Sequence, residues 1–448
     1  MAEICVYGLG YVGLPTASLL ATAGFQVLGI DVNQQVVEAL QEGRTCLKEA
    51  GLATVVSAAF SSGNLVAATR GEASEIFVIC VPTPTSADPK TGEHGVDLRA
   101  VESVARAIAP LIQPGNLVIL ESTSPVGTTR NVVGRIIAEG SGLKPGVDFD
   151  LCYCPERVLP GNTITELVTN SRTIGGFTPE AAHRAKAMYE RFCQGNMTIT
   201  DDQTAELCKL MENTYRDVNI AVANVFARIA EEVGVDIWKA IEFANLHPRV
   251  KILSPGPGVG GHCIPVDPWF LIEAYPEISG LLRESRHVND TQGKRMLDRL
   301  MATGQLAAGD KLAILGCAYK CDIDDPRESP AFLLAEAALE AGLKPAIHDP
   351  VVEPGEHHGF TRTHTVSNDL ESVLDGAAAA VLVTEHKQYR TLSSRSFSDH
   401  MPGRLVGDCR NWLNHSSLTL AGFTVVTIGI GGTEVRETRG AAKRVAHA

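Results

Sequence analysis

Short apolar runs alternate with segments of helical period over the first 120 residues. The apolar runs cover residues 4–7, 27–30, 76–81 and 117–120, and the segment from about Val12 to Ala23 follows the period of a helix. Runs of this length that are separated by helices are typical of strands in a sheet covered on both faces. The pattern predicts a doubly wound domain with parallel strands.

A long helical pattern occupies residues 201–233, which contain neither glycine nor proline. Asp201 or Asp202 is its expected N-cap, Gly234 is its expected end, and a second helix is expected to begin at Val235. A helix of this length needs neighbours along it. The pattern therefore predicts a central helical region that joins two lobes and is a candidate dimer interface.

A second alternating section begins at Lys311. Apolar residues 312–315 lead into Gly316, a helix is expected over about 330–341, and further apolar runs cover 346–348 and 379–383. The fold class we predict is α/β, with two Rossmann-like doubly wound domains joined by a central helical region. The predicted parts are a first doubly wound domain at 1–200, the central region at 201–300, a second doubly wound domain at 301–433 and a flexible tail at 434–448.

Length and charge narrow the class of protein. The 448 residues exceed the roughly 250 to 300 at which one core stops growing, so two or three domains are expected. A net charge of −13 without a basic stripe argues against a nucleic-acid partner. The longest apolar run, residues 377–383, is too short for a membrane span, and the strand-like run at Ile4 leaves no room for a signal peptide. We predict a cytoplasmic protein.

The eleven cysteines are an odd number and include no C-x-x-C pair. In a reducing compartment most of them are expected to be buried thiols. No set of histidines and cysteines has the spacing of a structural zinc site, so no metal is predicted.

A dinucleotide-binding turn is predicted at Gly8, Gly10 and Gly13. The first glycine permits the tight turn, the second lets the backbone approach a pyrophosphate, and the third allows close helix packing. Asp31 ends the next strand, 18 residues beyond Gly13, and is expected to bind the adenosine ribose. Its charge repels a 2′-phosphate and no arginine follows it at once, which favours NAD over NADP. The alternative is a glycine-rich turn without a ligand.

Two further loops follow apolar runs, at residues 81–84 and 122–127. Ligands bind at the carboxyl ends of strands in such sheets, which makes Thr83 and Thr123 candidate cofactor contacts. Each loop by itself also fits a polar connection whose prolines fix its shape.

Lys209, Asn213 and Arg216 are spaced i, i+4 and i+7 and share one face of the long helix. A solvated polar stripe is the alternative. The segment from Ser254 to Cys263 is rich in glycine and proline, and its glycines are expected to let the backbone approach a ligand.

Cys263 precedes a helix expected to start near Pro265, a position where a thiol is activated by a lowered pKa. A reactive thiol at a nicotinamide site indicates a four-electron oxidation. An alcohol is oxidised to an aldehyde, the thiolate adds to give a thiohemiacetal, a second oxidation gives a thioester, and water releases the acid.

Several stretches together resemble the UDP-glucose/GDP-mannose dehydrogenase family, over about residues 3 to 415. The matching stretches are residues 153–161, 206–220, 247–250, 256–270, 319–320 and 327–330. The resemblance implies that Cys263 is the nucleophile and that Lys209 and Asn213 stabilise an oxyanion. It makes Glu156 the base for thioester hydrolysis and Asp267 a partner that orients Lys209 or water.

The resemblance makes residues 1–200 an NAD-binding domain, 201–300 a central dimerisation domain with the catalytic lysine and cysteine, and 301–433 a UDP-sugar-binding domain.

The resemblance also implies binding residues. Thr123 assists Glu156, and the expected contacts to NAD are Tyr11, Val12, Asp31, Thr83, Thr123 and Arg327. The expected contacts to the nucleotide sugar, whose diphosphate the basic members counter, are Arg157, Val158, Lys209, Asn213, Arg216, His247, Arg249, Gly260, Tyr319, Lys320 and Arg410.

The loop after Glu156 bears on the sugar. UDP-glucose members of the family have an aromatic residue and a Glu-Gly pair there, whereas this chain has Arg157 and Pro160-Gly161. That difference favours a UDP-N-acetylhexosamine, foremost UDP-N-acetyl-D-mannosamine, with UDP-N-acetylglucosamine and UDP-glucose left open. Arg410 stands where relatives have lysine. The family places Arg249 across a dimer interface, so a homodimer is expected.

Two other readings compete. One is a two-electron dehydrogenase acting on a hydroxy acid, with an inert Cys263 and Lys209 as general acid or base. The other is an NAD-binding sensor without catalysis, which the intact set of Lys209, Asn213, Cys263 and Asp267 disfavours.

Overall fold

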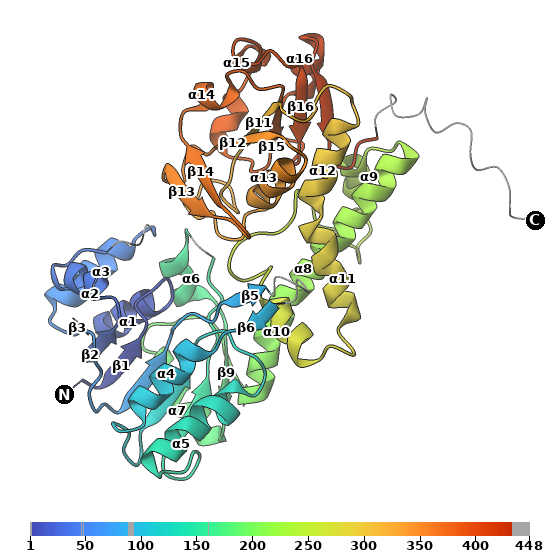
Figure 1. The fold of residues 1–448 in the computed structure, drawn as a ribbon. Coiled ribbons are helices and arrows are strands. Elements are labelled where there is room, and N and C mark those ends of the chain that lie inside the picture. Colours follow the sequence, from blue (N-terminus) through green and yellow to red (C-terminus); the bar gives the residue numbers. More distant parts are fainter. Residues whose placement is uncertain (1, 46, 48, 88–93, 160, 432–448) are drawn as a thin grey trace, which may run out of the picture. The chain divides into compact units, whose positions relative to one another are not determined.

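The computed structural model describes residues 2–45, 47, 49–87, 94–159 and 161–431, which form two compact units (Figure 1). The first unit is Met1–Asn213 with Trp269–Ile278, and the second is Thr214–Pro268 with Ser279–Ala448. The units divide within the long helix, so the boundaries predicted near residues 200 and 300 stay predictions. The tail predicted at 434–448 lies outside the described residues.

The first unit is built on an eight-stranded sheet. All neighbouring strands are parallel except β8 and β9, which pair antiparallel. The sheet is therefore mixed, where the apolar pattern alone predicted only parallel strands. In spatial order the strands are β10 (Met197–Asp201), β9 (Arg172–Gly176), β8 (Asp150–Tyr153), β7 (Leu117–Leu120), β4 (Ile76–Ile79), β1 (Ile4–Tyr7), β2 (Val27–Ile30) and β3 (Leu65–Ala68).

Alternate side chains of each central strand enter two different cores. Ile4 and Val6 of β1 belong to one cluster, and Cys5 and Tyr7 belong to the other. The first core is covered by α1 (Gly13–Thr22), α2 (Gln34–Gln41), α3 (Leu52–Ser61) and α7 (Pro179–Tyr189). The second is covered by α4 (Arg99–Ile108) and α5 (Arg135–Ser141). Burial on both faces explains the continuous apolar runs. The remaining elements are β5 (Thr85–Ala87), β6 (His94–Val96), the π-helix η1 (Thr129–Gly134) and α6 (Thr163–Thr169).

The second unit repeats this arrangement around a seven-stranded sheet, in which only β13 and β14 pair antiparallel. In spatial order its strands are β13 (Gly355–His358), β14 (Thr363–Ser367), β12 (Lys344–His348), β11 (Lys311–Leu315), β15 (Ala379–Leu382), β16 (Leu405–Asp408) and β17 (Thr424–Thr427). Together the two sheets confirm the predicted α/β class.

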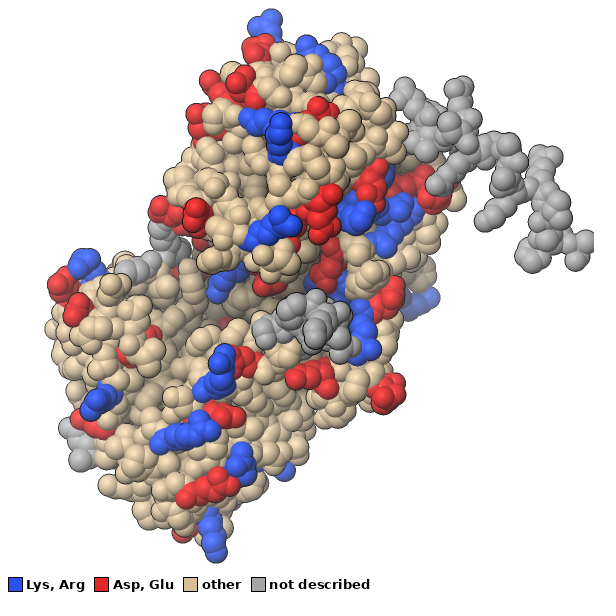
Figure 2. All heavy atoms as spheres, in the orientation of Figure 1, with Lys and Arg blue, Asp and Glu red and all other residues tan. Residues whose placement is uncertain are grey.

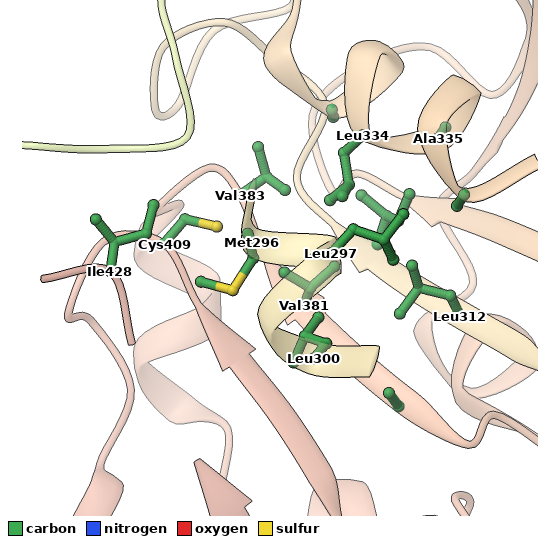
Figure 3. Close-up of a cluster of buried hydrophobic side chains, with 14 of the residues drawn as sticks. Met296, Leu297, Leu300, Leu312, Leu334, Ala335, Val381, Val383, Cys409 and Ile428 are labelled. Atoms are coloured by element: carbon green, nitrogen blue, oxygen red, sulfur yellow. The ribbon is translucent and has the colours of Figure 1, made fainter. Parts of the chain in front are cut away.

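Helices cover both faces of this second sheet as well. Figure 3 shows one core, where Met296, Leu297 and Leu300 of α12 (Gln292–Met301) meet Leu312 and Val381 of the strands. The same core takes in residues of α8 (Asp202–Val233), α9 (Ile237–Ala244) and α13 (Pro330–Glu340). The other face is covered by α14 (Leu370–Leu374), η2 (Lys387–Thr391), α15 (Ser394–Ser398) and α16 (His415–Leu420). Between α9 and α12 the chain forms α10 (Asp267–Ala274), most of which belongs to the first unit, and α11 (Gly280–Asp290) of the second unit.

The predicted long helix is α8, a single helix of 32 residues. The Asp201 carboxylate accepts the Thr204 amide at 2.9 Å, which caps its first turn as predicted. It ends at Gly234, whose φ of +77° is the left-handed conformation that stops a helix. The next helix, α9, begins at Ile237 instead of Val235, because the Asp236 side chain caps it.

Most predicted elements are present, with errors at their ends. The β4 strand stops at Ile79, two residues before the predicted end, and the helix after Cys263 begins at Asp267 instead of near Pro265. On the face drawn in Figure 2, basic and acidic side chains are interspersed. Among the described residues, no helix is both long enough and apolar enough to cross a membrane.

Candidate active site

The turn after β1 has the geometry of a nucleotide cradle. Gly8 has a φ of +91°, and a Cβ there would lie 2.8 Å from the Cys80 carbonyl oxygen. At Gly13 a Cβ would lie 1.8 Å from the Gly8 carbonyl oxygen, so only glycine lets α1 start this close to the strand. At Gly10, by contrast, no described atom lies within 4 Å of an added Cβ. Protein packing does not require that glycine, and the open space fits a bound pyrophosphate.

Asp31 follows β2 beside this turn, one residue beyond the strand that it was predicted to end. One carboxylate oxygen accepts the Leu9 amide at 3.0 Å and the other accepts the Asn33 amide at 2.9 Å. These two bonds fix the half-exposed carboxylate next to the glycine turn, in the position predicted for a ribose contact. The first amides of α1 face the same turn, so the chain's own groups fit an NAD molecule. Tyr11 and Val12, the other contacts predicted within the turn, are both half-buried.

The two loops predicted to reach the cofactor contact each other. The Thr83 hydroxyl donates to the Thr123 carbonyl oxygen at 2.6 Å, and the Ser122 hydroxyl donates to the Val81 carbonyl oxygen at 2.6 Å. Both loops follow adjacent strands of the sheet, β4 and β7. The structure thus brings Thr83 and Thr123 together at the carboxyl edge where a doubly wound sheet binds ligands.

Lys209 and Glu156 come together in the first unit. The buried Lys209 ammonium donates to the Glu156 backbone carbonyl oxygen at 2.8 Å. Removal of the Glu156 carboxylate from water raises its pKa, against the opposing charges of Lys209 and Arg172. The same carboxylate accepts the Val158 amide at 2.6 Å. A cation and a carboxylate with a raised pKa at one spot can stabilise an oxyanion and activate water.

Arg157 is held by protein groups. Its guanidinium forms an ion pair with Glu212 at 2.7 Å and donates to the Thr173 hydroxyl at 2.8 Å. A carboxylate already compensates this charge, so Arg157 anchors its loop in addition to any contact with a diphosphate. Pro160 of the same motif lies outside the described residues.

The glycine-proline segment before Cys263 packs closely against other residues of the second unit. Side chains added at its glycines would strike protein atoms: at Gly256 the Arg410 guanidinium at 2.7 Å, and at Gly261 the Tyr319 ring at 2.9 Å. At Gly260 a Cβ would lie 2.7 Å from the Tyr319 Cβ. The prediction was that these glycines make room for a ligand. The structure shows that they first make room for Arg410 and Tyr319, two predicted substrate contacts.

Cys263 lies in the turn immediately before α10. Its carbonyl oxygen accepts the amides of Val266 at 3.1 Å and Asp267 at 2.8 Å, and its side chain is half-buried. The Asp267 side chain is 2% exposed and begins the helix. The structure therefore places the predicted nucleophile and this carboxylate on consecutive turns of the second unit.

The other predicted residues are dispersed over the second unit. Arg327 is exposed and pairs through two nitrogens with Asp325, and Arg410 pairs with Glu385 at 3.0 Å. Exposed positions are held by three further predicted substrate contacts, Arg216, His247 and Arg249. Half-buried positions are held by Asn213 at the end of the first unit and by Tyr319 and Lys320 in the second.

Two buried carboxylates that organise these loops were missed. Glu206 stands one turn before Lys209 on α8, and that spacing alone was available as a signal. Asp349 follows β12 as Asp31 follows β2, and it accepts the amides of Cys317 and Ala318 at 2.7 and 2.8 Å. His386 also bonds Asp349 at 3.0 Å and helps to hold the pKa of that carboxyl far below its usual value. Asp349 is fully buried, unlike Asp31. In the part of the chain that the structure describes, no cluster of three His, Cys, Asp or Glu side chains is arranged to hold a metal.

One known family matches the chain along most of its length, through three separate domains. Residues 2–193 match the NAD-binding domain of the UDP-glucose/GDP-mannose dehydrogenase family. Residues 203–291 match the central domain of that family, and residues 313–415 match its UDP-binding domain.

Individual relatives cover nearly the whole chain. A UDP-N-acetyl-D-mannosamine dehydrogenase of Methanococcus aeolicus is 40% identical over 97% of this chain and 97% of the relative. An NDP-N-acetyl-D-galactosaminuronic acid dehydrogenase of Ralstonia nicotianae is 42% identical over 91% of this chain and 95% of the relative. A solved UDP-D-ManNAc dehydrogenase from Pyrococcus horikoshii is 37% identical with a TM-score of 0.86, covering 95% of this chain and 99% of that one.

Replacing Gly10 by alanine should weaken NAD binding without unfolding the protein. The added Cβ meets open space in the protein, so we expect the stability to change by no more than about 1 kcal/mol. In the bound state it meets the pyrophosphate, and we expect the Kd for NAD to rise about tenfold or more. The matched variant Gly13→Ala strikes backbone and should lose about 2 kcal/mol or more of stability. Urea unfolding and NAD titration measure both; wild-type NAD affinity in Gly10→Ala contradicts the assigned cradle.

Proposed function

The chain belongs to the UDP-glucose/GDP-mannose dehydrogenase family, and from that premise we propose that it oxidises the C6 primary alcohol of a UDP-N-acetylhexosamine to the uronate. It is an NAD-dependent nucleotide-sugar dehydrogenase, as the sequence motifs predicted. The observation that carries the proposed reaction is the bond from Lys209 to the Glu156 carbonyl oxygen, because it joins the proposed oxyanion stabiliser to the proposed hydrolytic base.

The proposed substrate is UDP-N-acetyl-D-mannosamine. The relatives quoted above are named for N-acetylated mannosamine and galactosaminuronic acid nucleotides. The loop from Arg157 to Gly161 supports the same class, because it lacks the aromatic residue and the Glu-Gly pair of UDP-glucose members. UDP-N-acetylglucosamine and UDP-glucose are the alternatives.

The residues that would hold NAD are those of the first unit's glycine turn, with Tyr11, Val12, Asp31, Thr83 and Thr123, and Arg327 of the second unit. NAD, when bound, supplies a hydride acceptor for each of two oxidations. The substrate and two NAD+ with one water give the carboxylate, two NADH and three protons. The chain's own groups must therefore bind the sugar nucleotide, hold the aldehyde and manage the protons.

Cys263 is proposed to hold the aldehyde after the first oxidation. Its thiolate adds to the aldehyde carbon to form a C–S bond and a thiohemiacetal. Loss of a hydride from that carbon and of the hydroxyl proton gives a thioester. Water then adds to the thioester, the C–S bond breaks and the thiolate is restored. The aldehyde stays bound to the protein between the two oxidations.

Lys209, Asn213 and Glu156 are proposed to serve these steps. The Lys209 ammonium and the Asn213 amide donate to the oxygen that gains negative charge at each addition. The Glu156 carboxylate, assisted by Thr123, takes a proton from the attacking water. The raised pKa of Glu156 suits this carboxylate to act as a base. Asp267 orients Lys209 or the water.

The nucleotide is proposed to bind through cations and backbone. Positive side chains in a protein of net charge −13 attract the diphosphate only where they gather locally. The contacts proposed for the UDP-sugar are Arg157, Val158, Lys209, Asn213, Arg216, His247, Arg249, Gly260, Tyr319, Lys320 and Arg410.

A homodimer is proposed on one face of α8. Eight large apolar side chains of this helix are exposed, among them Tyr215 at 70% and Ile229 at 52%. At about 100° per residue, all eight fall within roughly 100° of the helix circumference, opposite to Lys209 and Asn213. The eight residues are Leu207, Met211, Tyr215, Val222, Val225, Phe226, Ile229 and Val233. A continuous apolar face is the kind of surface that a second copy covers.

The reaction should release two NADH for each substrate molecule oxidised. We expect the highest turnover with UDP-N-acetyl-D-mannosamine in a screen that also contains UDP-N-acetylglucosamine, UDP-glucose and GDP-mannose. NADH absorbance and mass spectrometry of the product measure the stoichiometry and the acid. One NADH per substrate, with no carboxylate formed, supports a two-electron dehydrogenase and contradicts the proposal.

Replacing Cys263 by serine should abolish net formation of the acid. Serine is a far weaker nucleophile at neutral pH, so the thioester route is blocked while the substrate and NAD still bind. Rapid-mixing NADH traces and titration calorimetry separate turnover from binding. Cys208→Ser, at another half-buried cysteine, should retain turnover. Undiminished steady-state turnover in Cys263→Ser would contradict the assignment of Cys263 as the nucleophile.

A charge on the apolar face of α8 should separate the dimer. Val222→Glu places a carboxylate at a position that is 41% exposed in the single chain, so the chain should still fold. In the dimer the same carboxylate would be buried against the apolar face of the second copy, so association should be lost. Sedimentation velocity should give twice the chain mass for the wild type and the chain mass for the variant. Val147→Glu, at a position 79% exposed in the first unit, is the matched control and should stay dimeric. A dimeric Val222→Glu protein refutes this interface.

A further inference from the structure

Glu206 is a fully buried carboxylate whose hydrogen-bond partners among the described residues are the loop after β7 and the start of η1. One of its oxygens accepts the Thr129 amide at 2.8 Å and the Thr129 hydroxyl at 2.6 Å, and the other accepts the Gly127 amide. Its side chain has no exposed surface. Three donors converge on this one carboxylate from a stretch of three residues.

The loop that Glu206 holds carries Thr123. Within that loop the Ser124 hydroxyl donates to the Ser122 carbonyl oxygen, and Thr83 donates to the Thr123 carbonyl oxygen. On the other side, Glu206 precedes Lys209 by three residues on α8, so the two side chains share a face of the helix. Glu206 is thus the direct bond between the helix that carries Lys209 and the loop that carries Thr123.

We propose that Glu206 is a positioning residue that fixes the Thr123 loop against the Lys209 helix, and that it does so as an ionised carboxylate. This inference rests on the proposed function, which assigns Thr123 and Lys209 to the reaction. Glu206 contacts backbone amides and the Thr129 hydroxyl rather than a reacting group, so its effect on the reaction passes through Thr123.

The chemistry of the three donors makes the charge state matter. Two backbone N–H groups and a hydroxyl all donate to the ionised form. A protonated carboxyl carries a hydrogen of its own, and the two amides cannot accept it because they only donate. Protonation of Glu206 therefore weakens the hydrogen bonds that hold the loop. Burial raises the pKa of Glu206 to about 7, against the lowering effect of these hydrogen bonds. Its ionisation therefore falls within the physiological range.

Charged neighbours surround this carboxylate on two elements. Asp202, one turn earlier on α8, raises the pKa of Glu206 further. Arg130 of η1 pairs with Asp202, and Lys209 lies one turn later on α8. The Arg130–Asp202 pair also ties η1 to α8 but does not touch the Gly127 and Thr129 amides. It provides a matched control for a purely structural link.

Turnover of wild type and Glu206→Gln should be compared from pH 5.5 to 8.5, with the nucleotide sugar that reacts best in the screen. Glutamine cannot ionise, and its amide hydrogens face the donors of the loop. We expect the ratio of wild-type to variant kcat to rise with pH, with a midpoint near 7, to about tenfold, the effect of one hydrogen bond to a charged group.

Stability should change in the opposite direction over the same range. A carboxyl whose pKa is raised in the folded protein stabilises the fold below its ordinary pKa of about 4.5, and this contribution is lost as the pH rises through about 7. The Tm of the wild type relative to Glu206→Gln should therefore fall between pH 5 and 8 while the kcat ratio rises. A residue that acts only through stability predicts that both quantities fall together.

A second variant keeps the test open if Glu206→Gln does not fold. Thr129→Val removes the hydroxyl that donates to Glu206 while keeping nearly the same shape. Loss of this donor should raise the pKa of Glu206, so the fall of kcat at acid pH should begin at a higher pH than in the wild type. Thr129→Ser keeps the hydroxyl and should show the same pH dependence of kcat as the wild type. Arg130→Lys keeps the cation beside Asp202 but cannot pair with it through two nitrogens, so it should lower the Tm and leave the pH profile in place.

The outcomes separate this inference from the proposed function. A flat kcat ratio, or a fall of kcat at acid pH that Thr129→Val leaves in place, overturns the role of Glu206 while nucleotide-sugar oxidation stands. No oxidation of any nucleotide sugar by the wild type overturns the proposed function and the inference with it.

Discussion

The unbroken backbone hydrogen bonding of α8 constrains much of the rest of the structure. Over 32 residues without glycine or proline, the helix fixes the direction of every side chain by its number alone. Glu206, Lys209 and Asn213 face one side, and the exposed apolar residues from Leu207 to Val233 face the other. The same helix contributes its first part to one compact unit and its remainder to the other. One regular element thereby carries proposed catalytic groups and a proposed subunit contact.

Close packing around glycine is the second constraint. Gly8 and Gly13 let α1 begin against β1, where a Cβ would overlap a carbonyl oxygen. Gly256, Gly260 and Gly261 lack side chains that would collide with Arg410 or Tyr319. Gly10 is different, since the protein leaves space beside it. Glycines that look alike in the sequence therefore serve two purposes, room for the protein and room for a ligand.

Carboxylates that accept backbone amides organise the loops around the proposed site. Asp31 and Asp349 each accept amides of the turn that follows the first strand of their sheet. Glu206 does the same for the loop after β7. Each buried charge costs desolvation energy, which convergent N–H donors offset. Other carboxylates pair with cations proposed to bind the substrate, as Glu212 does with Arg157 and Glu385 with Arg410.

The sequence by itself determined the α/β class, the glycine turn with Asp31, the extent of α8 and the family, because local periodicity and short motifs encode these features directly. It did not determine the antiparallel pairs in the sheets or the beginning of α9 and α10, which depend on pairing and capping partners. Tertiary structure alone decided that Arg157 binds Glu212, that glycines near Cys263 admit Arg410 and Tyr319, and that Glu206 holds the Thr123 loop. The physical reason is distance along the chain: these partners are separated by tens to hundreds of residues, and no period in the sequence records which of them meet.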